Sequence, residues 1–367
     1  MKIAMVDLKK QYATIKDEID SAVNEVISST QFILGKQVGE FEGACASYLN
    51  SKYAFACASG TDALQICLMA LDIKPGDEVI TTPFTFVATA ETIALLGAKP
   101  VYVDIDEKTY NIDVTKIEAA ITEKTKAIIP VHLFGQAADL DPIISIAKKH
   151  NLYVIEDAAQ AFGTEYKGKR VGALADAAAT SFFPSKNLGC YGDSGMVFTQ
   201  NENLATKIKM IAAHGSKERY VHEILGLNSR MDTLQAAILN VKIKYIDKWN
   251  KARANNAKLY SEKLCNANVV LPYVADFSNH IYHQFSIRVQ DRKGLQEFLA
   301  SKDIPSAVHY PIPLHQQPAF KHLSEGLVLP VAEKVAKEIM SLPMYPELSA
   351  EEIDYIASSI IEFVGKK

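Results

Sequence analysis

One lysine, Lys186, lies in a context that suits chemistry rather than solvation. It stands in S-F-F-P-S-K-N-L-G, which follows a β-type run at 177–182 and precedes the Gly-rich turn at 192–195. Aromatic residues, proline and glycine surround it, and no helical face is available to expose it. A lysine removed from water loses its proton more readily, and the neutral amine attacks an aldehyde to form a Schiff base. Most lysines are solvated surface residues, so the residue type alone does not indicate a catalytic role. The prediction for Lys186 therefore depends on the surrounding sequence.

A carboxylate and an amide follow another apolar run, residues 152–155. Asp157 and Gln160 lie in E-D-A-A-Q, directly after that run. An ionised aspartate keeps a pyridine nitrogen protonated, which makes the ring an electron sink. Gln160 suits a hydrogen bond to the phenolic oxygen of such a ring. A helix N-cap explains Asp157 equally well.

Two other features suit a planar, phosphorylated ligand. Gly60 and Thr61 follow a β-type run and open a helix, where backbone N–H groups bind phosphate; a capped turn explains them too. Ser181 would add a hydroxyl to this phosphate site. Phe86, in T-T-P-F-T-F, suits stacking on a ring, and core packing is the alternative.

These residues must be positioned by a sheet. Seven β-type runs alternate with helical patterns, which predicts a mainly parallel seven-stranded α/β sheet with flanking helices. The runs are A-F-A-C-A, D-E-V-I-T-T, K-P-V-Y-V-D-I, K-A-I-I-P-V, L-Y-V-I-E-D, A-A-A-T-S-F-F and G-M-V-F-T. All four features fall where a predicted strand ends, and open α/β sheets bind ligands at the carboxyl ends of their strands.

The flanking regions predict a second, smaller domain. Pattern and composition predict helices at 7–50 with a break at 35–39, a long helix at 231–264, a strand at 281–289, a helix at 292–301, a Pro-rich stretch at 309–318 and two further helices. We expect a large domain at 1–250 and a smaller C-terminal α+β domain at 251–367.

The bulk composition argues against several classes of protein. The chain has 367 residues and a net charge of −4, which supplies no basic stripe for nucleic acid or an anionic membrane. Its 5 cysteines include no C-x-x-C pair, so neither a metal site nor a disulfide framework is expected. No stretch has the character of a signal peptide or membrane span. We expect a cytoplasmic protein.

The chain resembles the DegT family of nucleotide-sugar aminotransferases over nearly its whole length. The segments that carry the resemblance include S-G-T-D-A-L, G-D-E-V-I-T-T-P-F-T-F, I-E-D-A-A-Q-A, S-F-F-P-S-K-N-L-G-C-Y-G-D, N-S-R-M-D-T-L-Q-A-A and H-Y-P-I-P-L-H. The resemblance implies a fold type I enzyme dependent on pyridoxal 5'-phosphate, with no metal.

The resemblance also implies residue roles. Lys186 would form the Schiff base, Asp157 would contact the pyridine nitrogen and Gln160 the phenolic oxygen. Further cofactor contacts would come from Gly60, Thr61, Ser181 and Phe86. Asn228 would reach the phosphate of the neighbouring subunit, in a homodimer with shared active sites. Sugar or amino-donor contacts would come from Arg230, His309 and Tyr310. The family often has glycine where Ser194 stands, which would shift the loop after Lys186 slightly.

Within the family the chain is most similar to members that aminate a UDP-linked 3-keto sugar, particularly UDP-2-acetamido-2-deoxy-3-oxo-D-glucuronate, with L-glutamate as donor in amino-sugar and surface polysaccharide biosynthesis. An aminotransferase for a 4-keto or dTDP-linked 3-keto sugar is the alternative. A non-catalytic regulator of the same fold would not need Lys186, and the related dehydratases have histidine at that position. A Rossmann dehydrogenase lacks support, because no G-x-G-x-x-G follows the first strand.

Overall fold

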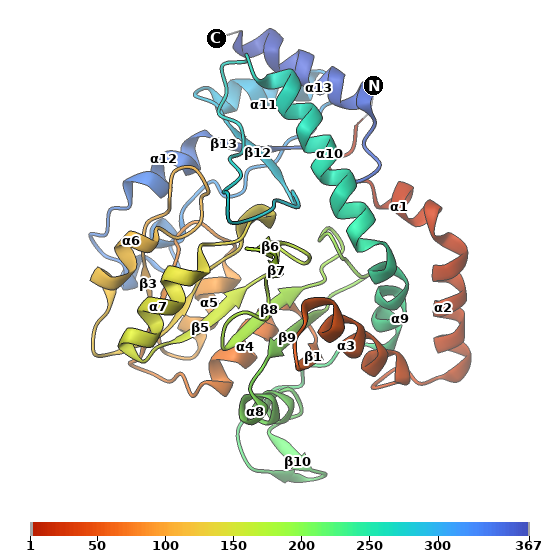
Figure 1. Ribbon diagram of the computed structural model, residues 1–367, viewed down its shortest axis with the longest axis vertical. Coiled ribbons are helices and arrows are strands. Elements are labelled where there is room, and N and C mark those ends of the chain that lie inside the picture. Colours follow the sequence, from red (N-terminus) through yellow and green to blue (C-terminus); the bar gives the residue numbers. More distant parts are fainter. Residues whose placement is uncertain (1–2, 366–367) are drawn as a thin grey trace.

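A seven-stranded sheet forms the centre of the protein, whose computed structural model describes residues 3–365 (Figure 1). Its strands are β1 Tyr53–Cys57, β2 Glu78–Thr81, β3 Lys99–Tyr102, β4 Thr125–Ile129, β5 Tyr153–Asp157, β8 Ala177–Ser181 and β9 Gly195–Thr199. Their order is β1-β9-β8-β5-β4-β2-β3. The strands from β8 to β3 run parallel, whereas β9 is antiparallel to both β8 and β1. Each strand overlaps one predicted run, and the mainly parallel fold is confirmed.

Helices cover both faces of the sheet. They are α4 Gly60–Ala70, α5 Ala88–Leu95, α6 Val114–Ile117, α7 Leu140–His150 and α8 Glu202–Ala212. Neighbouring residues of β4 enter different cores: Ile129 packs in the cluster of α4 and α8, and Ile128 in that of α6 and α7. Successive strand side chains point to opposite faces. The strands are therefore buried on both sides, which explains their apolar sequences.

The N-terminal helices pack on two later helices. The elements are α1 Leu8–Thr14, α2 Lys16–Ser29, α3 Lys36–Leu49, α9 Thr233–Lys242 and α10 Ile246–Leu264. The break predicted at 35–39 lies earlier in the chain: α2 ends at Ser29, Thr30 caps it in the left-handed region with φ 55°, and Gly39 lies inside α3. The single helix predicted at 231–264 was also wrong, because a 3₁₀ turn at Ile243–Tyr245 separates α9 from α10.

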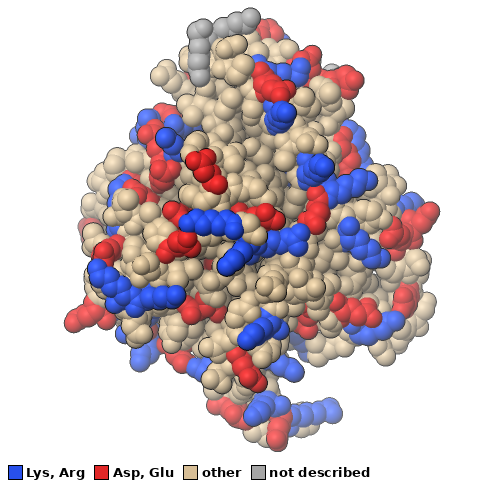
Figure 2. All heavy atoms as spheres, in the orientation of Figure 1, with Lys and Arg blue, Asp and Glu red and all other residues tan. Residues whose placement is uncertain are grey.

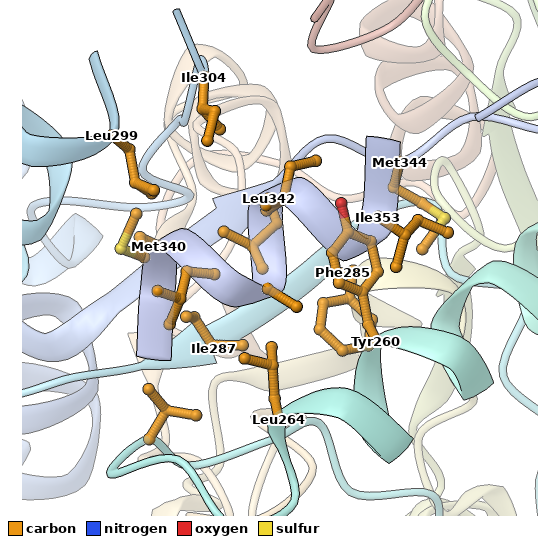
Figure 3. Packing of buried hydrophobic residues seen from close by; sticks show 14 of the residues in the cluster. Tyr260, Leu264, Phe285, Ile287, Leu299, Ile304, Met340, Leu342, Met344 and Ile353 are labelled. Carbon is orange, nitrogen blue, oxygen red and sulfur yellow. The ribbon is translucent and has the colours of Figure 1, made fainter. Parts of the chain in front are cut away.

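The C-terminal region has its own hydrophobic core (Figure 3). Its elements are β12 Phe285–Arg288, α11 Arg292–Ser301, α12 Pro330–Glu338, β13 Ile339–Leu342 and α13 Ala350–Val364. Phe285 and Leu342 face each other across the antiparallel β12 and β13 pair, and Tyr260 of α10 stacks on Phe285 with ring centroids 4.9 Å apart. The helix predicted at 292–301 is confirmed, the strand predicted at 281–289 is shorter, and β13 was not predicted.

The predicted domain boundary falls within α10. Trp249, near the start of this helix, packs with α2 and α9, whereas Tyr260 and Leu264 belong to the C-terminal core. One helix thus contributes to both parts of the molecule (Figure 1). The division at 250/251 remains a prediction.

The remaining elements are short and lie mostly in connections. They are η1 Glu118–Ala120, η2 Leu133–Gly135, η4 Leu314–Gln316, η5 Lys321–Leu323, β6 Glu165–Tyr166, β7 Lys169–Arg170, β10 Ser216–Glu218 and β11 Val221–His222. The β10–β11 hairpin extends away from the body at the bottom of Figure 1. Acidic and basic residues are interspersed on the face shown in Figure 2. Within residues 3–365, no helix is both long enough and apolar enough to cross a bilayer.

Candidate active site

A cavity of about 520 Å³ opens where the central strands end. Its wall is formed by segments that follow β1, β2, β5 and β8 and by two C-terminal segments. Nine of the eleven predicted site residues line it: Gly60, Thr61, Phe86, Asp157, Gln160, Ser181, Lys186, His309 and Tyr310. The structure therefore brings together residues separated by up to 250 positions in the chain.

Lys186 lies on an irregular segment between β8 and β9, and its side chain faces this cavity. Its backbone N–H donates to the Phe183 carbonyl at 2.8 Å, which closes a tight turn just before it. Burial lowers the pKa of Lys186 to about 8, and the charge of Asp157 opposes this shift. A larger fraction of neutral amine is therefore present near pH 7 than on a surface lysine, as nucleophilic attack requires.

Asp157 occupies the last position of β5 and is 5% exposed. One carboxylate oxygen accepts from the Thr89 hydroxyl at 2.8 Å, and the other accepts from the Ala159 backbone N–H at 3.2 Å. Burial raises the pKa of Asp157, while these two bonds and the charge of Lys186 oppose that effect. Residues 158–164 form turns and irregular backbone, so no helix begins at Asp157. The N-cap alternative for Asp157 is therefore wrong.

Glu156 and His132 hold the end of β5 in place. The Glu156 side chain is fully buried and accepts from the backbone N–H groups of Gly172, Leu174 and Ala175 at 2.7–3.0 Å. It also contacts His132 Nε2 at 3.0 Å. Because the Ala138 N–H donates to His132 Nδ1, Nε2 carries the proton and donates to Glu156. The sequence argument did not identify this pair.

Gln160 is oriented by bonds at both ends of its amide. Its oxygen accepts from the Phe134 N–H at 2.7 Å, so its NH₂ group points to the Tyr310 hydroxyl, 3.0 Å away. A donor is thus fixed at this end of the cavity. Phe86, at 6.4 Å between ring centroids from Tyr310, is 54% exposed. The core-packing alternative for Phe86 is therefore wrong.

The start of α4 offers an anion site. Ser59 caps the helix by accepting from the Asp62 N–H at 3.0 Å, which leaves earlier N–H groups of the first turn available. A Cβ at Gly60 would lie 2.6 Å from Cβ of Ser181, so only glycine permits this approach of α4 to the end of β8. The buried Ser194 hydroxyl also lines the cavity and has no hydrogen-bond partner within residues 3–365.

Two histidines close the cavity from the C-terminal side. His309 Nδ1 contacts the Ser341 hydroxyl at 2.9 Å, and His283 Nδ1 contacts Asn187 Oδ1 at 3.3 Å. Burial and the charge of Lys186 lower the pKa of His309 to about 4, so its imidazole is neutral at pH 7. His283 was not identified from the sequence; neither were Thr89 and the cavity-lining Gln284.

These residues fit pyridoxal phosphate. The cavity has an amine of lowered pKa at Lys186, a buried carboxylate at Asp157 and a fixed amide donor at Gln160. Phe86 offers an exposed aromatic face, and the α4 N-terminus with Ser181 and Ser194 offers donors for a phosphate. Each part of the cofactor thus has a chemically matched partner.

Comparison with known sequences decides the family. Residues 13–361 match the DegT/DnrJ/EryC1/StrS aminotransferase family. The chain belongs to this family.

Members of the DegT/DnrJ/EryC1/StrS family resemble the chain along its length. UDP-2-acetamido-2-deoxy-3-oxo-D-glucuronate aminotransferase of Pseudomonas aeruginosa is 51% identical over 358 residues, with 98% of this chain and 99% of that protein covered. The pleiotropic regulatory protein of Geobacillus stearothermophilus is 52% identical, with 99% of each chain covered. The structure of ntda from Bacillus subtilis with bound cofactor PMP has a TM-score of 0.91 and 34% identity, covering 100% of this chain and 86% of that one.

Two residues expected from the family resemblance lie outside the cavity of their own chain. Asn228 and Arg230 precede α9 and are exposed. Ser229 between them is buried; its hydroxyl donates to Asp62 and accepts from the Ala58 N–H at 3.1 Å. This anchor leaves Asn228 and Arg230 exposed on either side of it.

Proposed function

We propose that this protein is a pyridoxal-phosphate aminotransferase that moves the amino group of L-glutamate to a UDP-linked 3-keto sugar, UDP-2-acetamido-2-deoxy-3-oxo-D-glucuronate. The observation that carries the proposal is the convergence of Lys186, Asp157 and Gln160 on one cavity. The cysteines within residues 3–365 are free, which agrees with a reducing cytoplasm as its compartment.

When bound, pyridoxal phosphate supplies an aldehyde for amine exchange and a ring that accepts electrons. Lys186 would hold the cofactor covalently, and its amine would take up and return the proton at the reacting carbon. A positioned general acid and base of this kind contributes roughly 10²–10⁴-fold to the rate. Asp157 keeps the ring nitrogen protonated, and Gln160 orients the ring through its phenolic oxygen.

Catalysis explains this cavity better than a purely regulatory role does. A regulator would not need an amine of lowered pKa beside a buried carboxylate, yet both are present at Lys186 and Asp157. The 52% identity to a protein named as a regulator therefore does not change the proposal that this chain is an enzyme. The 51% identity to the Pseudomonas aminotransferase supports the 3-keto uronate as substrate.

The choice of sugar has a direct test. The planar guanidinium of Arg230, which lies outside the cavity of its own chain, suits a bidentate contact with the carboxylate of a uronate bound in a neighbouring subunit. We expect the reverse reaction, with 2-oxoglutarate and the 3-amino uronate, to proceed faster than with the neutral 3-amino hexosamine, and both faster than with a dTDP-linked or 4-amino sugar. The visible cofactor band reports each half-reaction, and an Arg230→Gln variant serves as the matched comparison. Reaction with a 4-amino sugar but not with the 3-amino uronate would contradict the substrate and leave the aminotransferase intact.

We further propose a homodimer in which each active site uses residues of both chains. Large apolar side chains are exposed on the hairpin and just after it: Tyr220 is 81% exposed and Leu225 is 89% exposed. Clusters of exposed apolar residues mark protein interfaces. Asn228, on the segment after this hairpin, would reach the phosphate of the partner's cofactor.

Subunit mixing tests the shared site. Lys186→Ala and Asn228→Ala subunits are each expected to be inactive alone. After exchange, a heterodimer has one site with intact Lys186 and intact Asn228, so activity should return to about a quarter of the wild-type value for random pairing of equal amounts. Exchange is verified with two differently tagged chains. If exchange occurs and activity does not return, Asn228 serves its own chain or none.

A further inference from the structure

Lys242, the last residue of α9, is a fully buried lysine that the chemistry above does not use. Its ammonium lies 4.9 Å from the Tyr191 ring centroid and 5.9 Å from that of Trp249. No ion pair joins it to a carboxylate within the part of the chain that is described. Burying a cation without a directly paired carboxylate is costly, and the aromatic faces and the more distant charge of Glu347 offset only part of that cost.

Among residues 3–365, this ammonium donates its hydrogen bond to the segment that carries Lys186. Lys242 Nζ donates to the Gly189 backbone carbonyl, three residues after Lys186. Within residues 3–365 this buried carbonyl has no other donor. A Cβ at Gly189 would lie 2.4 Å from the Pro184 carbonyl oxygen, so the segment folds closely on itself here.

Two more side chains hold the same segment. Gln235, seven residues before Lys242 and therefore on the same face of α9, accepts from the Tyr191 N–H at 2.8 Å. Asn187, directly after Lys186, donates to Asn250 of α10 at 2.7 Å. Residues 187–191 thus have no regular structure of their own; contacts with α9 and α10, together with the Cys190 N–H bond to the Phe182 carbonyl, fix their path.

We propose that Lys242 is a positioning residue, which holds the Gly189 carbonyl and thereby sets the backbone path that aims Lys186 into the cavity. The inference rests on the proposed role of Lys186 as the cofactor-binding amine. A buried apolar residue would give α9 a less costly core. The presence of a lysine at this position is explained if its bond to the Gly189 carbonyl helps to position Lys186.

The test compares Lys242→Met, which keeps most of the packing and removes the donor, with Lys244→Met. Lys244 has an exposed side chain two residues along the chain, so the control removes the same charge from the surface. The first measurement is hydrogen exchange of the cofactor-free protein. The second is the rate at which Lys186 captures pyridoxal phosphate, trapped by borohydride and located by mass spectrometry. Neither measurement requires a sugar substrate. A wrong sugar assignment therefore cannot be mistaken for a failure of the proposal about Lys242.

In Lys242→Met we expect faster exchange confined to the amides of residues 186–191 and capture slowed by about 10–10²-fold, because a small displacement of a reacting group costs that much. Lys244→Met should behave as wild type. Equally faster exchange throughout α9 and α10 would make Lys242 a structural residue and overturn the proposal. Local loosening with wild-type capture, or no change in either measurement, would overturn it too. If Lys242→Met does not fold, Lys242→Gln is judged by the same criteria.

Discussion

Replacing Lys186 with alanine is expected to abolish covalent capture of pyridoxal phosphate and to lower turnover by more than the roughly 10²–10⁴-fold that a general acid and base contributes. The loss exceeds that range because the same amine both holds the cofactor and moves the proton. Lys293→Ala, at a highly exposed position, is the matched control. Purified wild type should be yellow and bleach on addition of L-glutamate, and the variant should show neither property. Equal turnover by the variant would contradict the central assignment.

The pH dependence of capture gives an independent measure of the same amine. The pKa of Lys186 is lowered to about 8, and only the neutral form attacks the aldehyde. The capture rate should therefore rise with pH through about 8 and level off above it, whereas a surface lysine would continue to gain reactivity toward its usual value near 10.4. The rate is followed by absorbance after pyridoxal phosphate is added to the cofactor-free protein. A rate still rising steeply at pH 10 would show that the amine is not shielded from water.

Replacing Asp157 with asparagine is expected to lower kcat by about 10²–10³-fold, the usual cost of removing one preorganised electrostatic group from a site. Asparagine has a similar shape: its amide oxygen can accept from the Ala159 N–H, and its NH₂ group can donate to the Thr89 hydroxyl. Folding and cofactor capture should therefore persist, while the neutral amide no longer keeps the ring nitrogen protonated.

The control for this variant is Asp141→Asn, which removes an exposed carboxylate paired with Lys167. Thermal unfolding and capture should be close to wild type in both proteins, and only Asp157→Asn should slow the half-reaction with L-glutamate. An unchanged kcat in Asp157→Asn would reduce this residue to a carboxylate that orders the backbone at Ala159.

Much of the fold could be predicted because the strands of the sheet are buried on both faces and appear as separate apolar runs. β13 was missed because Ile339–Leu342 follows α12 without a turn residue, so nothing in the local pattern separates the two. The break between α9 and α10 contains no Gly or Pro, so the sequence gives no local signal for it. Trp249, just after the break, packs against residues of α2 and α9. Local sequence patterns therefore identified which helices and strands form better than they identified the residues at which those elements begin and end.

The cofactor residues could be predicted because each follows a strand and belongs to a recognisable motif. Thr89, His283 and Gln284 lie on elements whose local sequences give no such signal, and only the three-dimensional arrangement brings them to the cavity. Asn228 and Arg230 posed a different problem. Both are exposed outside the cavity of their own chain, and the sequence alone cannot distinguish an exposed loop from an interface.

The residues that line the cavity come from two separate parts of the chain, and this division has a consequence for how substrate specificity can evolve. Residues 59–194 supply the groups matched to the cofactor, whereas His283, Gln284 and His309 come from C-terminal segments. Because we propose that the sugar lies against the second set, we expect substitutions there to change the accepted sugar and to leave the cofactor contacts of the first set in place. At least two bonds cross the division, from Gln160 to Tyr310 and between His283 and Asn187. Redesign of the sugar pocket should therefore preserve Tyr310 and His283 and vary Gln284 and His309.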